Sequence, residues 1–201
     1  MLPPHAFTKE DVGDDLAFYA PPRLVTHIDD AAMVALTAYY AEVLPADGII
    51  LDLMSSWISH LPPALVTREV IGHGMNADEL AANPRLTRWF VQNLNRDASL
   101  PIADHSLDAA LCCVGIQYLQ RPIEVLGEVR RALRSGGSFV ISFSNRCFPT
   151  KAVAIWRSLD TAGHARLVTH YLQAAGFDGV ETVVLADGQR GDPLVAVVGR
   201  S

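Results

Sequence analysis

Short, continuous apolar runs alternate with helical patterns along this chain, and this alternation limits the fold more than any other feature. Residues 107–114 are apolar on both faces, which is typical of a parallel strand covered on both sides. A half-exposed antiparallel strand would instead alternate apolar and polar residues. The other predicted strands are residues 48–53, 68–72, 89–93, 138–144, 180–186 and 194–198.

The predicted helices lie between these runs. The clearest begins at Pro122, carries apolar residues at helical spacing and is closed by Gly136 and Gly137. A helix of about two turns is expected after the first strand, with Ser55 or Ser56 as its cap and Pro62 at its end. The other predicted helices are one capped by Asp29 or Asp30 that runs to about residue 44, residues 149–156 and residues 164–175. Strands that alternate with helices predict an α/β fold with a doubly wound sheet.

Composition agrees with a central sheet that is buried on both faces. The chain has 201 residues, of which 50% are hydrophobic, enough for one domain with a sizeable core. The net charge of −6 argues against nucleic acid as the main partner, because such proteins usually present a basic face. The longest apolar stretch, residues 109–116, is too short to cross a membrane.

Proline spacing and cysteine usage suggest how the chain is organised and where it resides. Proline pairs bracket the first twenty or so residues, so we divide the chain into an N-terminal arm or lid, residues 1–28, and a single domain, residues 29–201. The first ten residues lack the basic and apolar regions of a signal peptide. The three cysteines form no CxxC pair, which favours a reducing compartment, and we expect a cytoplasmic protein.

Three stretches occur in order along the second half of the chain: LPIADHSLDAALCCVGIQYL at residues 100–119, EVRRALRSGG at 128–137 and AAGF at 174–177. With these stretches the chain resembles the class I S-adenosylmethionine-dependent methyltransferases, close to methyltransferase type 11, over about residues 48–200. The resemblance implies a Rossmann-like sheet of seven strands, mostly parallel with the last strand antiparallel. It also implies S-adenosylmethionine as cofactor and S-adenosylhomocysteine as product.

The same resemblance places the cofactor in the loops after the first four strands. Asp52 matches the acidic residue that opens the family's first motif, but the glycines that should follow it are missing. Gly74 stands where the second motif carries a ribose-binding acid, so Asn76 or the Gly74 backbone is expected to replace that acid. Gly74 could instead be a turn residue that needs a positive φ. The implied cofactor residues are Asp52, Leu53, Met54, Ser55, Ser56, Gly74, Met75 (on the adenine ring), Asn76, Asn93, Leu94, Asn95, Cys113 and Val114. The adenine amine is assigned to Asn93, Asn95 or Asp97.

The sequence carries no recognisable catalytic motif. His60 or His73 could act as a general base for an acceptor that carries an O–H or N–H group, although a lone histidine there is more often structural. Phe18 and Tyr19 of the arm could fold over the cofactor. No metal site is expected, because no histidine has a second ligand at helical spacing. The catalytic candidates are His60, His73 and Tyr118, and the candidate substrate contacts are Tyr19, Trp57, Gln117, Tyr118 and Asn145.

The chain is therefore expected to methylate a small-molecule acceptor. The methyl carbon of the donor is already electrophilic, so the protein mainly aligns the acceptor and excludes water. The alternative is a non-catalytic relative that keeps the fold and serves as a binding or scaffold protein. An NAD-dependent oxidoreductase is a weaker interpretation, because no GxGxxG motif follows the first predicted strand.

Overall fold

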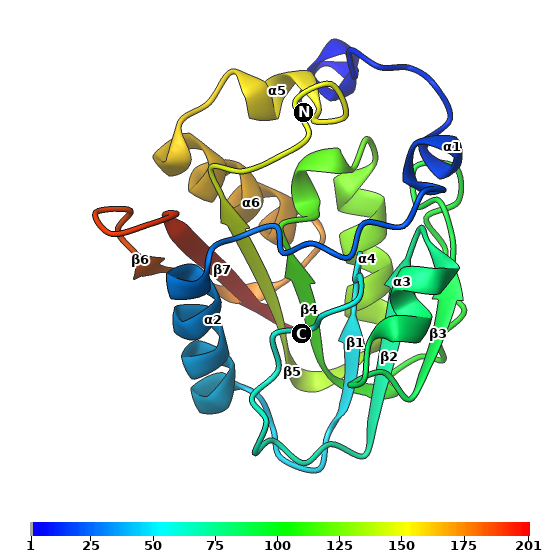
Figure 1. Cartoon of the computed structure of the whole chain (residues 1–201), viewed down its shortest axis with the longest axis vertical. Helices are drawn as coiled ribbons and strands as arrows, with labels where there is room; N and C mark the ends of the chain where they lie inside the picture. Colours follow the sequence, from blue (N-terminus) through cyan, green and yellow to red (C-terminus); the bar gives the residue numbers. More distant parts are fainter. Residues whose placement is uncertain (1) are drawn as a thin grey trace.

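The computed structural model describes residues 2–201 and contains a seven-stranded sheet of strand order β3-β2-β1-β4-β5-β7-β6. The first five strands pair in parallel, and the last strand is antiparallel to both of its neighbours (Figure 1). This confirms the predicted doubly wound sheet with an antiparallel last strand. The strands are β1 (Ile49–Asp52), β2 (Glu69–Gly74), β3 (Arg88–Val91), β4 (Leu107–Cys113), β5 (Leu133–Ser144), β6 (Asp178–Ala186) and β7 (Leu194–Arg200).

Successive residues of the central strands pack into opposite layers of the core. In β1, Leu51 packs into the layer under α4 (Pro122–Ala132) and α6 (Thr161–Ala174). Its neighbour Ile50 packs into the layer under α2 (Asp30–Val43). The apolar character of both faces of these strands is therefore the consequence of a sheet covered on both sides.

Side-chain caps mark the starts of several helices. Asp29 accepts a hydrogen bond from a backbone N–H of α2, and Asp160 does the same for α6. Asn76 caps α3 (Ala77–Ala82), a helix that the sequence pattern did not predict. In Figure 1, α3 and α2 lie on the same side of the sheet, and the segment of residues 53–68 passes between them.

The prediction of a helix after the first strand is wrong, because residues 53–68 contain no helix. The N–H groups of Leu53 and Ser55 donate to the carbonyls of Leu111 in β4 and His73 in β2. The N–H of Met54, whose φ is 58°, donates to the His73 ring. The positive φ of Met54 takes the chain out of helical geometry directly after β1, and these bonds hold that turn against β4 and β2.

Three other predicted helix boundaries also differ, and one of them is the start of α6, which begins at Thr161 instead of residue 164. Helix α4 ends at Ala132, because β5 already begins at Leu133 and pairs there with Leu107. The helix predicted from residue 149 to 156 forms only as α5 (Ala154–Arg157). The Ala154 N–H bonds to Thr8 of the arm instead of a helical partner, so the residues before it stay irregular.

Residues 2–28 pass across the carboxyl ends of the strands, from η1 (Pro4–Phe7) through α1 (Asp15–Tyr19) to the start of α2 (Figure 1). Met1, the first residue of the predicted arm, lies outside the described residues. The division of the chain at residue 28 stays a prediction. Within residues 2–201, none of the helices is long and apolar enough to cross a membrane.

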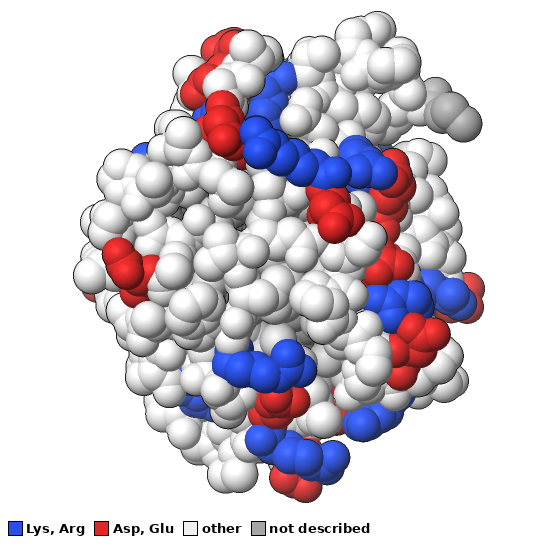
Figure 2. Space-filling model, turned by 90° about the vertical axis from the view of Figure 1, so that its right-hand side faces the viewer, with Lys and Arg blue, Asp and Glu red and all other residues white. Residues whose placement is uncertain are grey.

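Charged side chains of both signs lie next to one another on the β3 side of the molecule (Figure 2). One such pair joins β3 to β2, where Arg88 Nε lies 2.6 Å from Glu69 Oε1. The centre of this face is largely uncharged. Exposed pairs of this kind contribute little to stability, so they are surface features and not part of the core.

Candidate functional site

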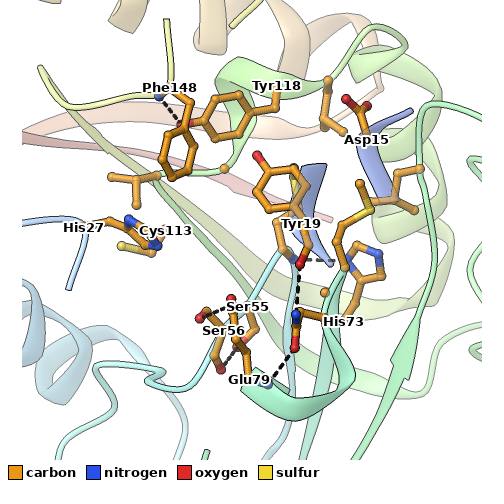
Figure 3. Close-up of a pocket in the computed structure, with 18 of the residues that line it drawn as sticks. Asp15, Tyr19, His27, Ser55, Ser56, His73, Glu79, Cys113, Tyr118 and Phe148 are labelled. Carbon is orange, nitrogen blue, oxygen red and sulfur yellow. Dashed lines mark hydrogen bonds between the residues drawn. The ribbon is translucent and has the colours of Figure 1, made fainter. Parts of the chain in front are cut away.

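A cavity of about 260 Å³ lies at the carboxyl ends of β1, β2, β3 and β4. In an open α/β sheet this edge is where ligands bind. The arm closes the cavity from the other side, so the walls combine sheet loops with residues far away in the sequence (Figure 3). The lining includes Met54–Ser56, His73–Asn76, Gln92–Asn95 and Cys113–Gly115 from the sheet edge, and Asp15, Tyr19, Arg23, Thr26 and His27 from the arm.

The loop after β1 is held by β2. The Ser55 N–H lies 2.6 Å from the His73 carbonyl oxygen, and the Met54 N–H lies 3.1 Å from His73 Nδ1. His73 Nε2 lies 3.0 Å from the Gln92 carbonyl, which fixes the ring as a neutral tautomer with its proton on Nε2. Burial lowers the pKa of His73 to about 4. His73 is therefore fully occupied in positioning this loop.

Asp52 lies behind the loop and does not line the cavity. Its side chain is 4% exposed, and its Oδ2 accepts a hydrogen bond from Ser55 Oγ at 2.6 Å. Burial raises the pKa of Asp52 to about 6, and the hydrogen bonds from Ser55 and Ser59 oppose that rise only partly. Asp52 therefore does not contact the cavity itself, and it holds the side chain of Ser55, which does.

Gly74 ends β2 where an acidic residue is expected in the family. A Cβ at this position would lie 2.6 Å from the Ser55 carbonyl oxygen, so a side chain cannot stand there unless the β1 loop moves. The φ of Gly74 is not positive, so the interpretation of Gly74 as a turn residue is wrong. Gly74 is required by the close approach of the Ser55 backbone.

Glu79 of α3 supplies a carboxylate to the cavity that the sequence analysis missed. Its side chain is buried, its Oε2 accepts from Ser56 Oγ at 2.6 Å, and its Oε1 accepts from the Arg23 N–H at 2.7 Å. Each carboxylate oxygen has room for a second hydrogen bond, so the group can still accept from a ligand. Only the fold of α3 against the β1 loop reveals this carboxylate.

Asn76 and Trp57 hold the arm. Asn76 Nδ2 donates to the carbonyls of Tyr19 and Ala20 at 2.8 and 2.9 Å, while its Oδ1 caps α3. Trp57 Nε1 donates to the Val25 carbonyl at 2.9 Å. Both residues belong to the stretches that replace the expected cofactor motifs, and both fix the arm over the cavity.

A buried ion cluster fixes the first part of the arm. Lys9 Nζ lies 2.7 Å from Asp15 Oδ2, and Lys151 Nζ lies 3.2 Å from Asp15 Oδ1 and 3.1 Å from Asp11 Oδ2. Asn95 Nδ2 also donates to Asp15, at 3.1 Å. Burial raises the pKa of Asp15, but the hydrogen bonds from Lys9 and Asn95 outweigh it, and the pKa lies below its ordinary value.

Aromatic rings form the wall opposite the β1 loop (Figure 3). The centroid of Phe148 lies 6.2 Å from that of Tyr19 and 6.1 Å from that of Tyr118. The Phe148 N–H donates to Tyr118 Oη at 2.9 Å, and burial raises the pKa of Tyr118 to about 12. His27 also faces this cluster, 5.7 Å from Phe148.

The structure brings fourteen of the predicted site residues to the cavity: Tyr19, Met54, Ser55, Ser56, His73, Gly74, Met75, Asn76, Asn93, Leu94, Asn95, Cys113, Val114 and Tyr118. Seven others lie elsewhere: Asp52, Leu53, Trp57, His60, Asp97, Gln117 and Asn145. Gln117 is buried with its amide bonded to the Val114 carbonyl, and Asn145 is exposed. His60 lies outside the cavity, and burial lowers its pKa to about 4.

Asp15, Arg23, His27, Glu79 and Phe148 line the cavity although the sequence analysis did not select them. Four of these five reach it only through the docking of the arm or the packing of α3, which no local pattern encodes. Within residues 2–201, no group of three His, Cys, Asp or Glu side chains is placed to hold a metal ion.

Residues 57–141 match the protein-family model described as a methyltransferase domain. A curated relative is the biotin biosynthesis bifunctional protein BioHC of Teredinibacter turnerae, which is 28% identical over 87 residues. This match covers 43% of the chain and 15% of the relative, so the chain corresponds to a small part of that protein.

Solved structures of methyltransferases have a similar fold. A Haloferax volcanii complex, described as that of the Trm112 methyltransferase activator and the putative methyltransferase, gives a TM-score of 0.64 at 15% identity, and the match covers 85% of this chain and 90% of that chain. An S-adenosylmethionine-dependent methyltransferase from Mesorhizobium loti gives a TM-score of 0.57 at 16% identity, and the match covers 83% of this chain and 98% of that chain. A Thermotoga maritima protein described as a possible histamine N-methyltransferase gives a TM-score of 0.60 at 16% identity, and the match covers 85% of this chain and 90% of that chain.

Proposed function

We propose that this chain, which has the class I methyltransferase fold and matches the methyltransferase domain over residues 57–141, transfers a methyl group from S-adenosylmethionine to a small organic acceptor. The observation that carries the proposal is the cavity where the loops after β1, β2, β3 and β4 meet. The family resemblance places the cofactor in the same four loops.

The groups that face the cavity suit a ligand with an apolar ring system and several polar groups. Met75 and Leu94 line it from the ends of β2 and β3 and offer apolar surface for the adenine ring. The carboxylate of Glu79 retains acceptor capacity for the ribose hydroxyls, which Gly74 cannot bind through a side chain. Asn93 supplies an amide beside Leu94. The residues present therefore fit S-adenosylmethionine, with Glu79 in place of the missing acid.

When bound, S-adenosylmethionine supplies an electrophilic methyl carbon on a sulfonium, and alignment of the acceptor does most of the remaining work. The arm closes the cavity through the bonds from Asn76, Trp57 and Glu79, and thereby excludes water. Tyr19, Tyr118 and Phe148 then bound the space left for the acceptor. The chain thus positions the acceptor against the cofactor and keeps water out of the site.

Thermal unfolding with S-adenosylmethionine, S-adenosylhomocysteine and NAD tests this proposal. Both sulfur compounds should raise the melting temperature in a concentration-dependent way, because a ligand that binds only the native state stabilises it, and NAD should not. Absence of a shift with either sulfur compound at millimolar concentration would overturn the proposal.

A non-catalytic binding protein is the second candidate. The observation that favours it is the engagement of Ser55, Ser56 and Glu79 with one another and with the arm, since these groups already have partners within the protein. A chain of this kind would show no stabilisation by S-adenosylhomocysteine, so the same experiment separates the two.

A further inference from the structure

The cavity has two walls of different chemistry, and the second wall bears on the acceptor. The first wall, the loops at the sheet edge, is the one assigned above to the cofactor. The second wall comes from the arm, η2 (Ile116–Tyr118) and the segment after β5, and it presents aromatic rings (Figure 3). The rings of Tyr19, His27 and Tyr118 pack around Phe148 at centroid distances of about 6 Å, and all four residues line the cavity, so they offer aromatic surface to a planar acceptor.

An acceptor that carries a proton must lose it, and most bases that line the cavity are already engaged. Asp15 is paired with Lys9 and Lys151, and Glu79 holds Ser56 and the arm. His73 uses both ring nitrogens to hold the β1 loop. Protonation of Asp15 or Glu79 would remove the negative charge on which these contacts depend, and His73 has no ring nitrogen left to accept a proton.

His27 differs from the other bases. Among residues 2–201, neither of its ring nitrogens has a hydrogen-bond partner, and its ring stands at 77° to that of Phe148. Burial lowers the pKa of His27, so the ring is neutral near pH 7 and can accept a proton. The charged groups that face it are Glu79 and Arg23, and the other titratable neighbour is His60.

Arg23 brings a positive charge to this part of the cavity, near the negative charge of Glu79. Its guanidinium stacks 4.6 Å from the centre of the Phe18 ring and donates to the Phe18 carbonyl at 2.9 Å. Within the described residues it has no carboxylate within 4.0 Å of its charged nitrogens. A cation without an ion pair favours an acceptor that becomes an anion and disfavours an ammonium.

We propose that His27 is the general base for an aromatic hydroxyl acceptor, a phenol or a hydroxylated heteroaromatic ring. The inference rests on the proposed function. The hydroxyl proton passes to a ring nitrogen of His27, and the acceptor oxygen forms a bond to the methyl carbon. The carbon–sulfur bond breaks and leaves its electron pair on sulfur. The products are a methyl ether and S-adenosylhomocysteine, and His27 then releases its proton to solvent.

The test uses the full chain with 4-nitrophenol as the hydroxyl probe and aniline as an amine of similar shape. The wild type should release S-adenosylhomocysteine with 4-nitrophenol and not with aniline. His27→Asn should lower kcat by about 10²- to 10⁴-fold, while the calorimetric Kd for S-adenosylhomocysteine stays within about twofold. His170→Asn, on the exposed side of α6, is the matched control and should behave as wild type.

A second readout needs no turnover. The yellow anion of 4-nitrophenol reports its ionisation when it is bound beside S-adenosylhomocysteine. In the wild-type complex the probe should ionise about one pH unit lower than in solution, and His27→Asn or Arg23→Gln should reduce this shift.

Three results would overturn the inference: transfer to aniline but not to 4-nitrophenol, no transfer to either compound, or wild-type kcat and probe ionisation in His27→Asn. Failure to bind S-adenosylhomocysteine is a different result, because it removes the proposed function itself.

Discussion

The residues that replace the expected cofactor motifs have defined structural partners. Ser55 and Ser56 donate to Asp52 and Glu79, and Asn76 holds the carbonyls of the arm. Gly74 is small because the Ser55 carbonyl approaches it closely. These residues therefore form one connected set, in which the loop after β1, the end of β2 and the arm are fitted to one another.

Asp52→Asn should change the pH dependence of stability. Burial raises the pKa of Asp52 from 3.8 to about 6, so between these values the folded protein binds more protons than the unfolded chain. Stability therefore falls as pH rises through this window, and the cost persists above it. The variant should be more stable than wild type by about 1–3 kcal/mol in urea unfolding near neutral pH.

The advantage of Asp52→Asn should disappear below about pH 4, where the carboxyl is protonated in both the folded and the unfolded chain. A gain of the same size at every pH, or a loss of stability near neutral pH, would show that Asp52 is not held as a destabilising buried acid.

Glu79→Gln should weaken S-adenosylhomocysteine binding by about 10- to 100-fold, because the ribose hydroxyls lose a charged acceptor. The amide keeps the shape of the side chain and can still bond Ser56 and the Arg23 N–H, so the fold should persist. Calorimetry measures the effect. Asp78→Asn, exposed in the same turn of α3, is the control, and equal affinities in the two variants would contradict the assignment.

For individual residues, the sequence predicts that those following the strands lie near the site, because the topology brings the carboxyl ends of the parallel strands together. It does not predict which of them face the cavity: Asp52 and Gln117 lie behind it, while Glu79 and His27 reach it. The positions of Glu79 and His27 depend on the docking of α3 and of the arm, and these contacts are long-range in the sequence.

At the scale of elements, the strands follow from the sequence and several connections do not. All seven predicted strands appear, and β5 begins five residues before its predicted start. The buried central strands were predictable because continuous apolar runs have few alternatives in a buried sheet. The connection between β1 and β2 carries no helix, because the chain leaves β1 through Met54 at positive φ, in a turn that is bonded to β4 and β2. Propensity could not predict these bonds.

The substitution Asn76→Asp should detach the arm from the end of β2. The carboxylate can still cap α3, but it cannot donate to the carbonyls of Tyr19 and Ala20, and it repels them. Hydrogen exchange should become about 10- to 100-fold faster in the arm, while amides of α3 keep their protection. Asn145→Asp, at an exposed position, is the control. Unchanged exchange in the arm would show that Asn76 does not hold it.

At the scale of the whole molecule, one sheet edge and one arm make the entire candidate site. The loops after β1 to β4 provide the cofactor wall, and the arm provides the aromatic wall with His27 and Arg23. The buried cluster around Asp15 and the bonds from Asn76, Trp57 and Glu79 fix these walls relative to each other. Acceptor and cofactor are therefore expected to share a single enclosed space.

The most direct test of this account is a crystal structure of the chain with S-adenosylhomocysteine. The account predicts the ligand in the cavity at the ends of β1–β4, with its ribose hydroxyls within hydrogen-bond distance of Glu79 and its sulfur facing the wall of His27 and Phe148. Ligand bound at another surface, or none bound at millimolar concentration, would contradict it.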